Sequence, residues 1–252
     1  MNKILFLPLA VVGLALGSAN AAISLLGGGT GSFATGATAV SYDYTALSSF
    51  DASGASKIVF TFSDETGAGD GAISGVTFGG AAMTLAVSGY NSNLQLAQVY
   101  YIDASSVGGG AFGTGDIVVT GPGSNDMGGS WLFLSGTADG VGSTNSALAQ
   151  SVGLTTSVGG SFVVASHANN GASGLAGGDL TTALLNADVG SAGGGSGYAT
   201  ITTAGAGTYS FTGSTSRPVT VAAAFAPAAI PEPTTTALLG LGGLALILRR
   251  RR

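Results

Sequence analysis

The chain has 252 residues, of which 45% are hydrophobic and only 8% are charged, and it contains no cysteine. Between residues 22 and 230, eleven carboxylates stand against two permanent cations, Lys57 and Arg217, so this part carries nine net negative charges. Such a surface repels a phosphate backbone, which excludes nucleic-acid binding, and without cysteine neither disulfides nor thiol chemistry is available. Although 45 glycines would suit a disordered chain, the hydrophobic content favours a glycine-rich β protein.

The first residues have the pattern of a secretory signal peptide. One cation, Lys3, precedes an apolar run over residues 4–16, and Ala19 and Ala21 have the small-x-small spacing of a signal peptidase site. This apolar run is shorter than the stretch that a helix needs to span the hydrocarbon core of a bilayer. We therefore expect residues 1–21 to form a signal helix that passes the secretion translocon and is removed by signal peptidase after Ala21. An uncleaved membrane anchor is the alternative.

Residues 22–226 alternate short apolar runs with glycine, serine, asparagine and aspartate, without a sustained helical period. In the first clear strand, residues 56–63, Ile58, Phe60 and Phe62 fall on one face. Gly79-Gly80 then predicts a hairpin between a strand with Val76 and Phe78 and one with Met83, Leu85 and Val87. Further strands are expected at residues 41–44, 94–102, 115–121, 130–136, 161–168, 198–203, 208–213 and 218–225.

Three segments are less regular. Leu180–Val189 fits either a short helix or a strand. The glycine-rich stretches 27–31 and 191–197 superficially resemble phosphate loops, but no Lys-Ser/Thr follows them, so we interpret both as plain loops. About ten short strands separated by turn residues predict an all-β protein, a single antiparallel β-sandwich or jelly-roll-like domain over residues 22–226.

The succession SGVTFGGAAMTLA, LQLAQVYYID, GDIVVTG and SWLFLSGTADGV, followed by an alanine-rich last strand, resembles a group of bacterial surface domains. These are predicted β-sandwiches in which a VTYGG-like hairpin precedes a short aromatic strand and an LSGV-like strand. The resemblance covers residues 56–225. It supports the fold and implies no activity.

The body offers few combinations of residues that are typical of active sites. His167 is the only imidazole, and no Gly-x-Ser-x-Gly elbow occurs, so we interpret His167 as a surface or strand-end residue without a chemical task. One histidine and no cysteine leave too few ligands for zinc. A glycoside hydrolase stays open as an alternative, because carboxylates whose separations are unknown are present at Asp64, Glu65, Asp70, Asp103, Asp116 and Asp126.

Calcium is the one metal for which the sequence offers a ligand set. The stretch SDETGAGDG holds Asp64, Glu65 and Asp70 in an expected loop, and hard cations prefer such oxygen ligands. The spacing matches neither the EF-hand loop nor the GGxGxD repeat, and a solvated acidic loop is the alternative. No other cofactor is expected.

Three aromatic residues bear on binding. Trp131 lies in the alternating strand 130–136, which favours core packing over an exposed sugar-stacking platform. Tyr100 and Tyr101 are adjacent in a strand, so one of them is expected to point outward and is the better candidate for a surface contact.

The C-terminal segment IPEPTTTALLGLGGLALILRRRR combines two prolines around an acidic residue, an apolar run and four arginines. Neither Pro231 nor Pro233 can donate a backbone hydrogen bond, and both favour extended backbone that an enzyme groove can bind. As a helix, the uncharged residues 234–248 would reach about 22 Å, short of a hydrocarbon core of about 30 Å. The arginines fix their end on the cytoplasmic side. We expect a marginal transmembrane helix that lodges in the membrane transiently.

This layout resembles the PEP-CTERM sorting signal, and we assign residues 227–252 to it. The resemblance implies that Pro231, Glu232 and Pro233 are the recognition triplet of an exosortase, an integral-membrane cysteine enzyme. It makes the chain a substrate without a catalytic residue of its own, in a Gram-negative host that produces extracellular polysaccharide. A plain stop-transfer anchor is the alternative. The stop-transfer cluster is Arg249, Arg250, Arg251 and Arg252.

Together these patterns predict an exported protein that passes through an inner-membrane intermediate to the cell surface or the extracellular space. The leading hypothesis for its body is a structural or adhesive component associated with exopolysaccharide. The second is a carbohydrate-binding module, with or without calcium, and the third is a glycan-active hydrolase.

Overall fold

The computed structural model describes residues 20–33, 37–42, 52–65, 75–91, 95–124, 126–171, 176–189 and 192–230. One compact unit comprises Ala21–Ala228, and a second comprises Met1–Asn20 with Ala229–Arg252. The described residues contain strands and two short 3₁₀ turns but no α-helix, which confirms the all-β class. The predicted signal and C-terminal helices fall almost wholly outside these residues. Within them, no helix has the length and hydropathy needed to cross a membrane.

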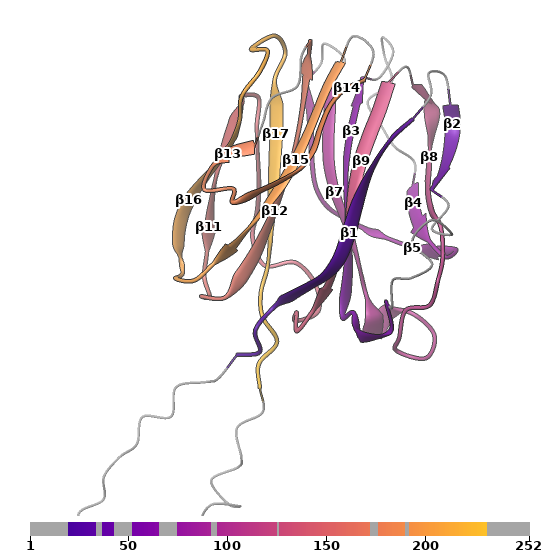
Figure 1. Ribbon diagram of the computed structural model, residues 1–252, viewed down its shortest axis with the longest axis vertical. Coiled ribbons are helices and arrows are strands. Elements are labelled where there is room, and N and C mark those ends of the chain that lie inside the picture. The colour runs from indigo at the N-terminus through magenta and orange to yellow at the C-terminus, as the bar shows by residue number, and fades with distance from the viewer. Residues whose placement is uncertain are drawn as a thin grey trace, which may run out of the picture. The chain divides into compact units, whose positions relative to one another are not determined.

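The strands form four sheets, and neighbouring strands in each are antiparallel (Figure 1). The first central sheet consists of β1 (Ser24–Phe33), β9 (Asp126–Ser135), β3 (Lys57–Glu65), β7 (Gln95–Asp103) and β6 (Thr84–Asn91). The second central sheet consists of β10 (Thr144–Ala147), β17 (Val219–Phe225), β12 (Ser161–Asn170), β15 (Ala192–Ile201) and β14 (Thr182–Val189). The first outer sheet consists of β2 (Ala37–Tyr42), β8 (Ile117–Ser124), β4 (Gly75–Phe78) and β5 (Ala81–Ala82). The second outer sheet consists of β11 (Ser151–Thr156), β16 (Gly205–Phe211) and β13 (Ala176–Gly178).

Three hydrophobic cores join these sheets into four layers, which Figure 1 shows edge-on. The two central sheets pack face to face, as in a sandwich, and each outer sheet covers the remaining face of one central sheet. The core under the first outer sheet includes Phe60, Phe62, Phe78, Ile117 and Phe133. The middle core includes Val59, Leu132, Phe162, Val221 and Phe225. The core under the second outer sheet includes Val152, Leu154, Val163, Tyr209 and Phe211.

The central strands are therefore buried on both faces. In β12 every residue from Ser161 to Asn169 is buried, and in β17 all seven residues are. In β17 this matches a nearly continuous apolar sequence, as expected when neither face of a strand meets water, whereas β12 also buries polar residues such as Ser166 and His167. The sequence predicts a sandwich of two sheets, and the structure adds a covering sheet on each side.

Most expected strands are confirmed, and the three core residues of the first one, Ile58, Phe60 and Phe62, share a core. The Gly79-Gly80 hairpin is also present, but the chain changes sheet after β5. Met83 is buried in the core under the first outer sheet, whereas Leu85 is 45% exposed, because the returning segment divides between β5 and β6, which belong to different sheets. Leu180–Val189 resolves as the strand β14 rather than a helix.

Both glycine-rich stretches interpreted as loops are strands, which corrects the sequence-based expectation. Gly27–Gly31 lies within β1, and the glycines of the second stretch lie in β15. The reason is close approach: a Cβ on Gly29 would come within 2.4 Å of the Trp131 indole, and one on Gly28 within 2.6 Å of the Trp131 carbonyl oxygen. Glycine is required where β1 lies against the indole ring and backbone of β9.

A similar close approach sets the separation of the two central sheets at Gly89 in β6. A Cβ there would lie 2.7 Å from Val219 Cγ2 and 2.8 Å from Val221 Cγ1 of the facing sheet. We expect Gly89→Ala to lower the free energy of unfolding by about 1–3 kcal/mol, because the added methyl overpacks this contact. Denaturant unfolding measures the loss. Gly75→Ala is the matched control, since no atom lies within 4 Å of its Cβ position; an equal loss in both variants would contradict this packing argument.

Candidate functional site

The two ends of the body leave it side by side. Ala21 N–H donates to the Ala228 carbonyl at 2.8 Å, and Asn20 forms an isolated bridge with Ala229. In Figure 1, β1 begins and β17 ends at the same end of the body. The expected signal peptidase site at Ala21 and the start of the C-terminal segment are thus neighbours. Ala19 lies outside the described residues.

After β17, the chain is also hydrogen-bonded to the loop that follows β9. Ala228 N–H donates to Gly136 O at 2.8 Å, and Ala138 N–H donates to Ala226 O at 2.9 Å. Gly136 has φ +73°, and a Cβ there would lie 2.4 Å from Ala22 O, so only glycine fits. These backbone hydrogen bonds attach the last residues of the body to the loop of residues 136–140.

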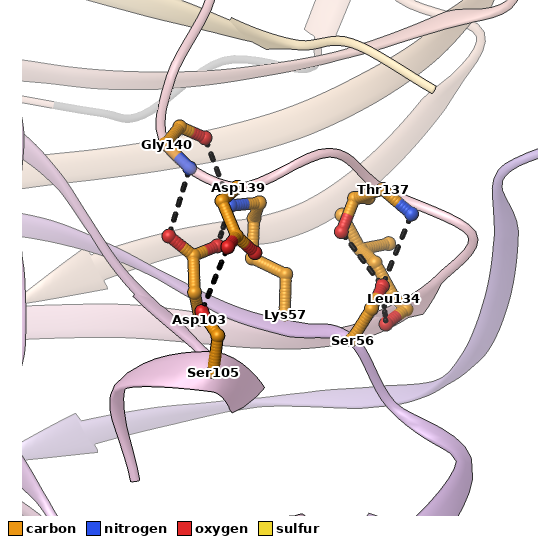
Figure 2. A network of polar contacts seen from close by, with 8 residues as sticks. All are labelled: Ser56, Lys57, Asp103, Ser105, Leu134, Thr137, Asp139 and Gly140. Atoms are coloured by element: carbon orange, nitrogen blue, oxygen red, sulfur yellow. Dashed lines mark hydrogen bonds and ion pairs between the residues drawn. The ribbon is translucent and has the colours of Figure 1, made fainter. Parts of the chain in front are cut away.

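Ser56, directly before β3, and side chains from β3 and β7 fix the loop (Figure 2). Ser56 Oγ contacts Thr137 Oγ1 at 2.7 Å and accepts from Thr137 N–H at 3.0 Å. Lys57 Nζ donates to Gly140 O at 2.8 Å, and Gly140 N–H donates to Asp103 Oδ2 at 2.8 Å. Lys57 and Asp103 also form an ion pair. Because Lys57 is paired directly with Asp103 across β3 and β7, both side chains reach the loop from one face of the sheet.

Lys57 is fully buried, at 0% exposure. Its Nζ lies 4.6 Å from the centre of the Tyr101 ring and 5.3 Å from that of Phe225. Burial lowers the pKa of Lys57, and its hydrogen bond and attraction to Asp103, with a further attraction to Asp139, offset only part of that effect. Asp103 is therefore the main group that favours the charged form of Lys57.

The sequence pattern alone does not pair these two residues. One feature pointed to a buried partner: the body's only lysine stands directly before three apolar strand residues, Ile58 to Phe60, where an unpaired ammonium would be costly. Its partner could not be identified without the strand register, because eleven carboxylates compete for that role.

His167 lies in the middle of β12 and is fully buried, which corrects the expectation of a surface or strand-end residue. Its ring stacks on Phe211 at 5.1 Å between centroids. Thr220 Oγ1 donates to Ala149 O at 2.6 Å, so it accepts from His167 Nδ1 at 2.9 Å, and Nε2 then accepts from Asn169 Nδ2 at 3.2 Å. These contacts fit a neutral ring that packs the second outer sheet onto β12.

Burial lowers the pKa of His167 to about 4 from its ordinary value of 6.5, although a hydrogen bond with the Val219 backbone offsets part of the shift. Between these values the unfolded chain binds a proton that the folded chain does not. We therefore expect the free energy of unfolding to fall by on the order of 3 kcal/mol as pH drops from about 6.5 to about 4. Denaturant unfolding across this range, compared with His167→Gln, isolates the effect; identical pH profiles would contradict it.

The calcium candidates do not assemble among the described residues. β3 extends through Asp64 to Glu65, so a strand stands where a loop was expected, and Asp64 is buried. Asp70 lies outside the described residues. No group of three potential metal-ligating side chains occurs in the part of the chain that the structure describes.

The aromatic candidates for surface contacts are also buried or half-buried. Trp131 is only 7% exposed within the core under the first outer sheet, which confirms its packing role. Tyr100 is buried in the same core and donates to Gln98 Oε1 at 3.1 Å. Tyr101 points to the opposite face, as alternation requires, but it is half-buried against Phe225 because a second sheet lies there.

Two of the shallow depressions on the described surface bear on ligand binding. One, of about 250 Å³, follows the turn between β15 and β16 and is lined by Asp179, Tyr209, Thr200, Thr202 and Thr203, among others. The other, of about 270 Å³, lies beside the glycine-rich segment 106–114 and includes Phe78 and Phe112. Only the first combines a carboxylate with several hydroxyl groups.

Comparison with known families identifies the segment that follows the body. Residues 229–252 match the model of the PEP-CTERM protein-sorting motif. The chain therefore carries a PEP-CTERM sorting motif, which implies an exosortase as its processing partner and indicates export to the cell surface or extracellular space through a membrane-anchored intermediate. No curated protein and no solved structure matches the chain. Pro231, Glu232, Pro233 and the four arginines lie outside the described residues.

Proposed function

We propose that the body is a structural or adhesive component of the cell surface, associated with extracellular polysaccharide. The observation that carries this proposal is the placement of reactive side chains. The chain's only histidine and the body's only lysine lie inside packed layers, at 0% exposure, where they fix sheets and a loop in place. A body in which these groups are buried, in a chain with only 8% charged residues, suits a passive role among glycans.

Fractionation of the host's extracellular matrix tests this role. We expect the mature protein to stay with exopolysaccharide through high-salt washing, and a deletion strain to produce a matrix with reduced cohesion under shear. A protein that leaves quantitatively in a low-salt wash, from a strain whose matrix is unchanged without it, would contradict the proposal.

A carbohydrate-binding role is the second candidate, and the depression at the β15–β16 turn favours it. Asp179 Oδ2 accepts from Thr208 N–H at 2.6 Å, which fixes the carboxylate beside threonine hydroxyls that can bond a sugar. Titration calorimetry of the purified mature protein with host exopolysaccharide, with and without calcium, is the test. Saturable heat that Thr203→Trp abolishes and the exposed control Thr215→Trp preserves would support this role. Absence of heat in the unmodified protein would reject it.

A further inference from the structure

We propose that Lys57 and Asp103 join through an intramolecular amide bond between Lys57 Nζ and Asp103 Cγ, formed by the folded body itself. The two residues are directly opposite in the antiparallel pair β3–β7, and their side chains are in contact as an ion pair. The body contains no cysteine, so this would be a covalent cross-link in a protein that cannot form a disulfide. The inference does not depend on the function proposed above.

The surroundings of Lys57 favour its reaction as a nucleophile. The amine is buried at 0% exposure and lies against the rings of Tyr101 and Phe225. A desolvated ammonium loses its proton more readily, and the neutral amine is the form that attacks a carbonyl carbon. Asp103 is itself 7% exposed, so water competes poorly with the amine at this position.

The backbone of Gly140 matches the two polar groups of the product amide. Its N–H donates to Asp103 Oδ2, the oxygen that becomes the amide carbonyl, and there it can stabilise the negative charge that develops during attack. Its carbonyl accepts from Lys57 Nζ, which retains one N–H after the bond forms. Both hydrogen bonds, each 2.8 Å long, can therefore persist from the ion pair through to the amide.

Asp139 supplies the proton-transfer group. Ser105 Oγ donates to Asp139 Oδ2 at 2.9 Å, which positions this carboxylate near the pair, and Asp139 attracts Lys57 electrostatically. Unlike Asp103, Asp139 is exposed and can exchange protons with solvent. Figure 2 shows these residues together with Gly140.

The reaction balances without a further reagent. The ammonium of Lys57 gives one proton to the Asp103 carboxylate, so that a neutral amine faces a carboxylic acid. Nζ attacks Cγ and forms the C–N bond, and Asp139 accepts a second proton from Nζ. The Cγ–Oδ1 bond then breaks as Asp139 returns that proton to Oδ1, which leaves as water. One ammonium and one carboxylate thus become one secondary amide and one water molecule.

Mass spectrometry of the full-length chain and of the mature protein from host cells tests the bond. We expect a mass lower than the sequence mass by one water molecule, a peptic peptide pair linked through Lys57 and Asp103, and resistance to trypsin after Lys57 in the denatured protein. An unchanged mass with complete tryptic cleavage after Lys57 would overturn the proposal.

Two variants separate the bond from the ion pair. Lys57→Arg keeps a cation but removes the nucleophilic amine, so we expect the full sequence mass in a protein that still folds. Asp139→Ala is expected to slow cross-linking at least about tenfold after refolding, as for loss of a general acid–base group, with restoration by Asp139→Glu. Cross-linking at an unchanged rate in Asp139→Ala would overturn the role given to Asp139.

Discussion

Asp103→Ala is expected to lower the free energy of unfolding by about 3–5 kcal/mol, one of the largest effects of any single substitution in this protein. The change leaves the fully buried Lys57 without its carboxylate partner and removes the acceptor of Gly140 N–H. In the ion-paired form, a buried charge that loses its partner retains the cost of desolvation without the compensating attraction, and the variant also cannot form the proposed Lys57–Asp103 amide bond. Denaturant unfolding at neutral pH measures the loss.

Two controls test the cause of this destabilisation. Ser105→Ala removes only the exposed hydrogen bond to Asp139 and is expected to cost less than about 1 kcal/mol. Lys57→Met combined with Asp103→Leu removes both charges and is expected to be more stable than Asp103→Ala alone, because no unpaired charge stays buried. A double variant no more stable than the single one would show that charge burial is not the cause.

Replacing both prolines of the sorting triplet, Pro231→Ala with Pro233→Ala, is expected to keep nearly all of the protein in the membrane-anchored form. Alanine restores backbone N–H groups and helical propensity, so the segment no longer stays extended for an enzyme groove. Immunoblotting of membrane and surface fractions measures the distribution. Thr235→Ala, within the same segment, is the control and should be sorted normally. Normal sorting of the double proline variant would contradict recognition through this triplet.

The geometry of the body bears on this sorting step. Only Ile230 separates the bridged Ala229 from Pro231, and Ile230 is 47% exposed. The triplet therefore follows the folded body almost immediately.

Much of the fold could be predicted from the sequence because strands and turns have local signatures. The alternation of Ile58, Phe60 and Phe62 and the Gly79-Gly80 turn needed no knowledge of distant residues. The second outer sheet was not predictable in the same way, since β11 and β13 are short and largely made of small or polar residues. The strand character of Gly27–Gly31 was also hidden, because it depends on the position of Trp131, about a hundred residues away in sequence.

The candidate functional residues likewise fall into two groups: those predictable from local sequence and those that depend on the fold. The sorting motif is contiguous, and its chemistry can be read from adjacent residues, which is why a family model recovers it. The cluster around Lys57 draws on residues separated by 46 and 83 positions, so its existence depends on strand register. His167 likewise looked like a strand-end residue until the second outer sheet, with Phe211, covered it.

The most direct measurement is mass spectrometry of the C-terminal peptide of protein recovered from the cell surface or the extracellular material. If the exosortase processes this chain, that peptide ends close to Pro231-Glu232-Pro233 and lacks the apolar run and its arginines. Surface protein that still carries Arg252 would contradict the account.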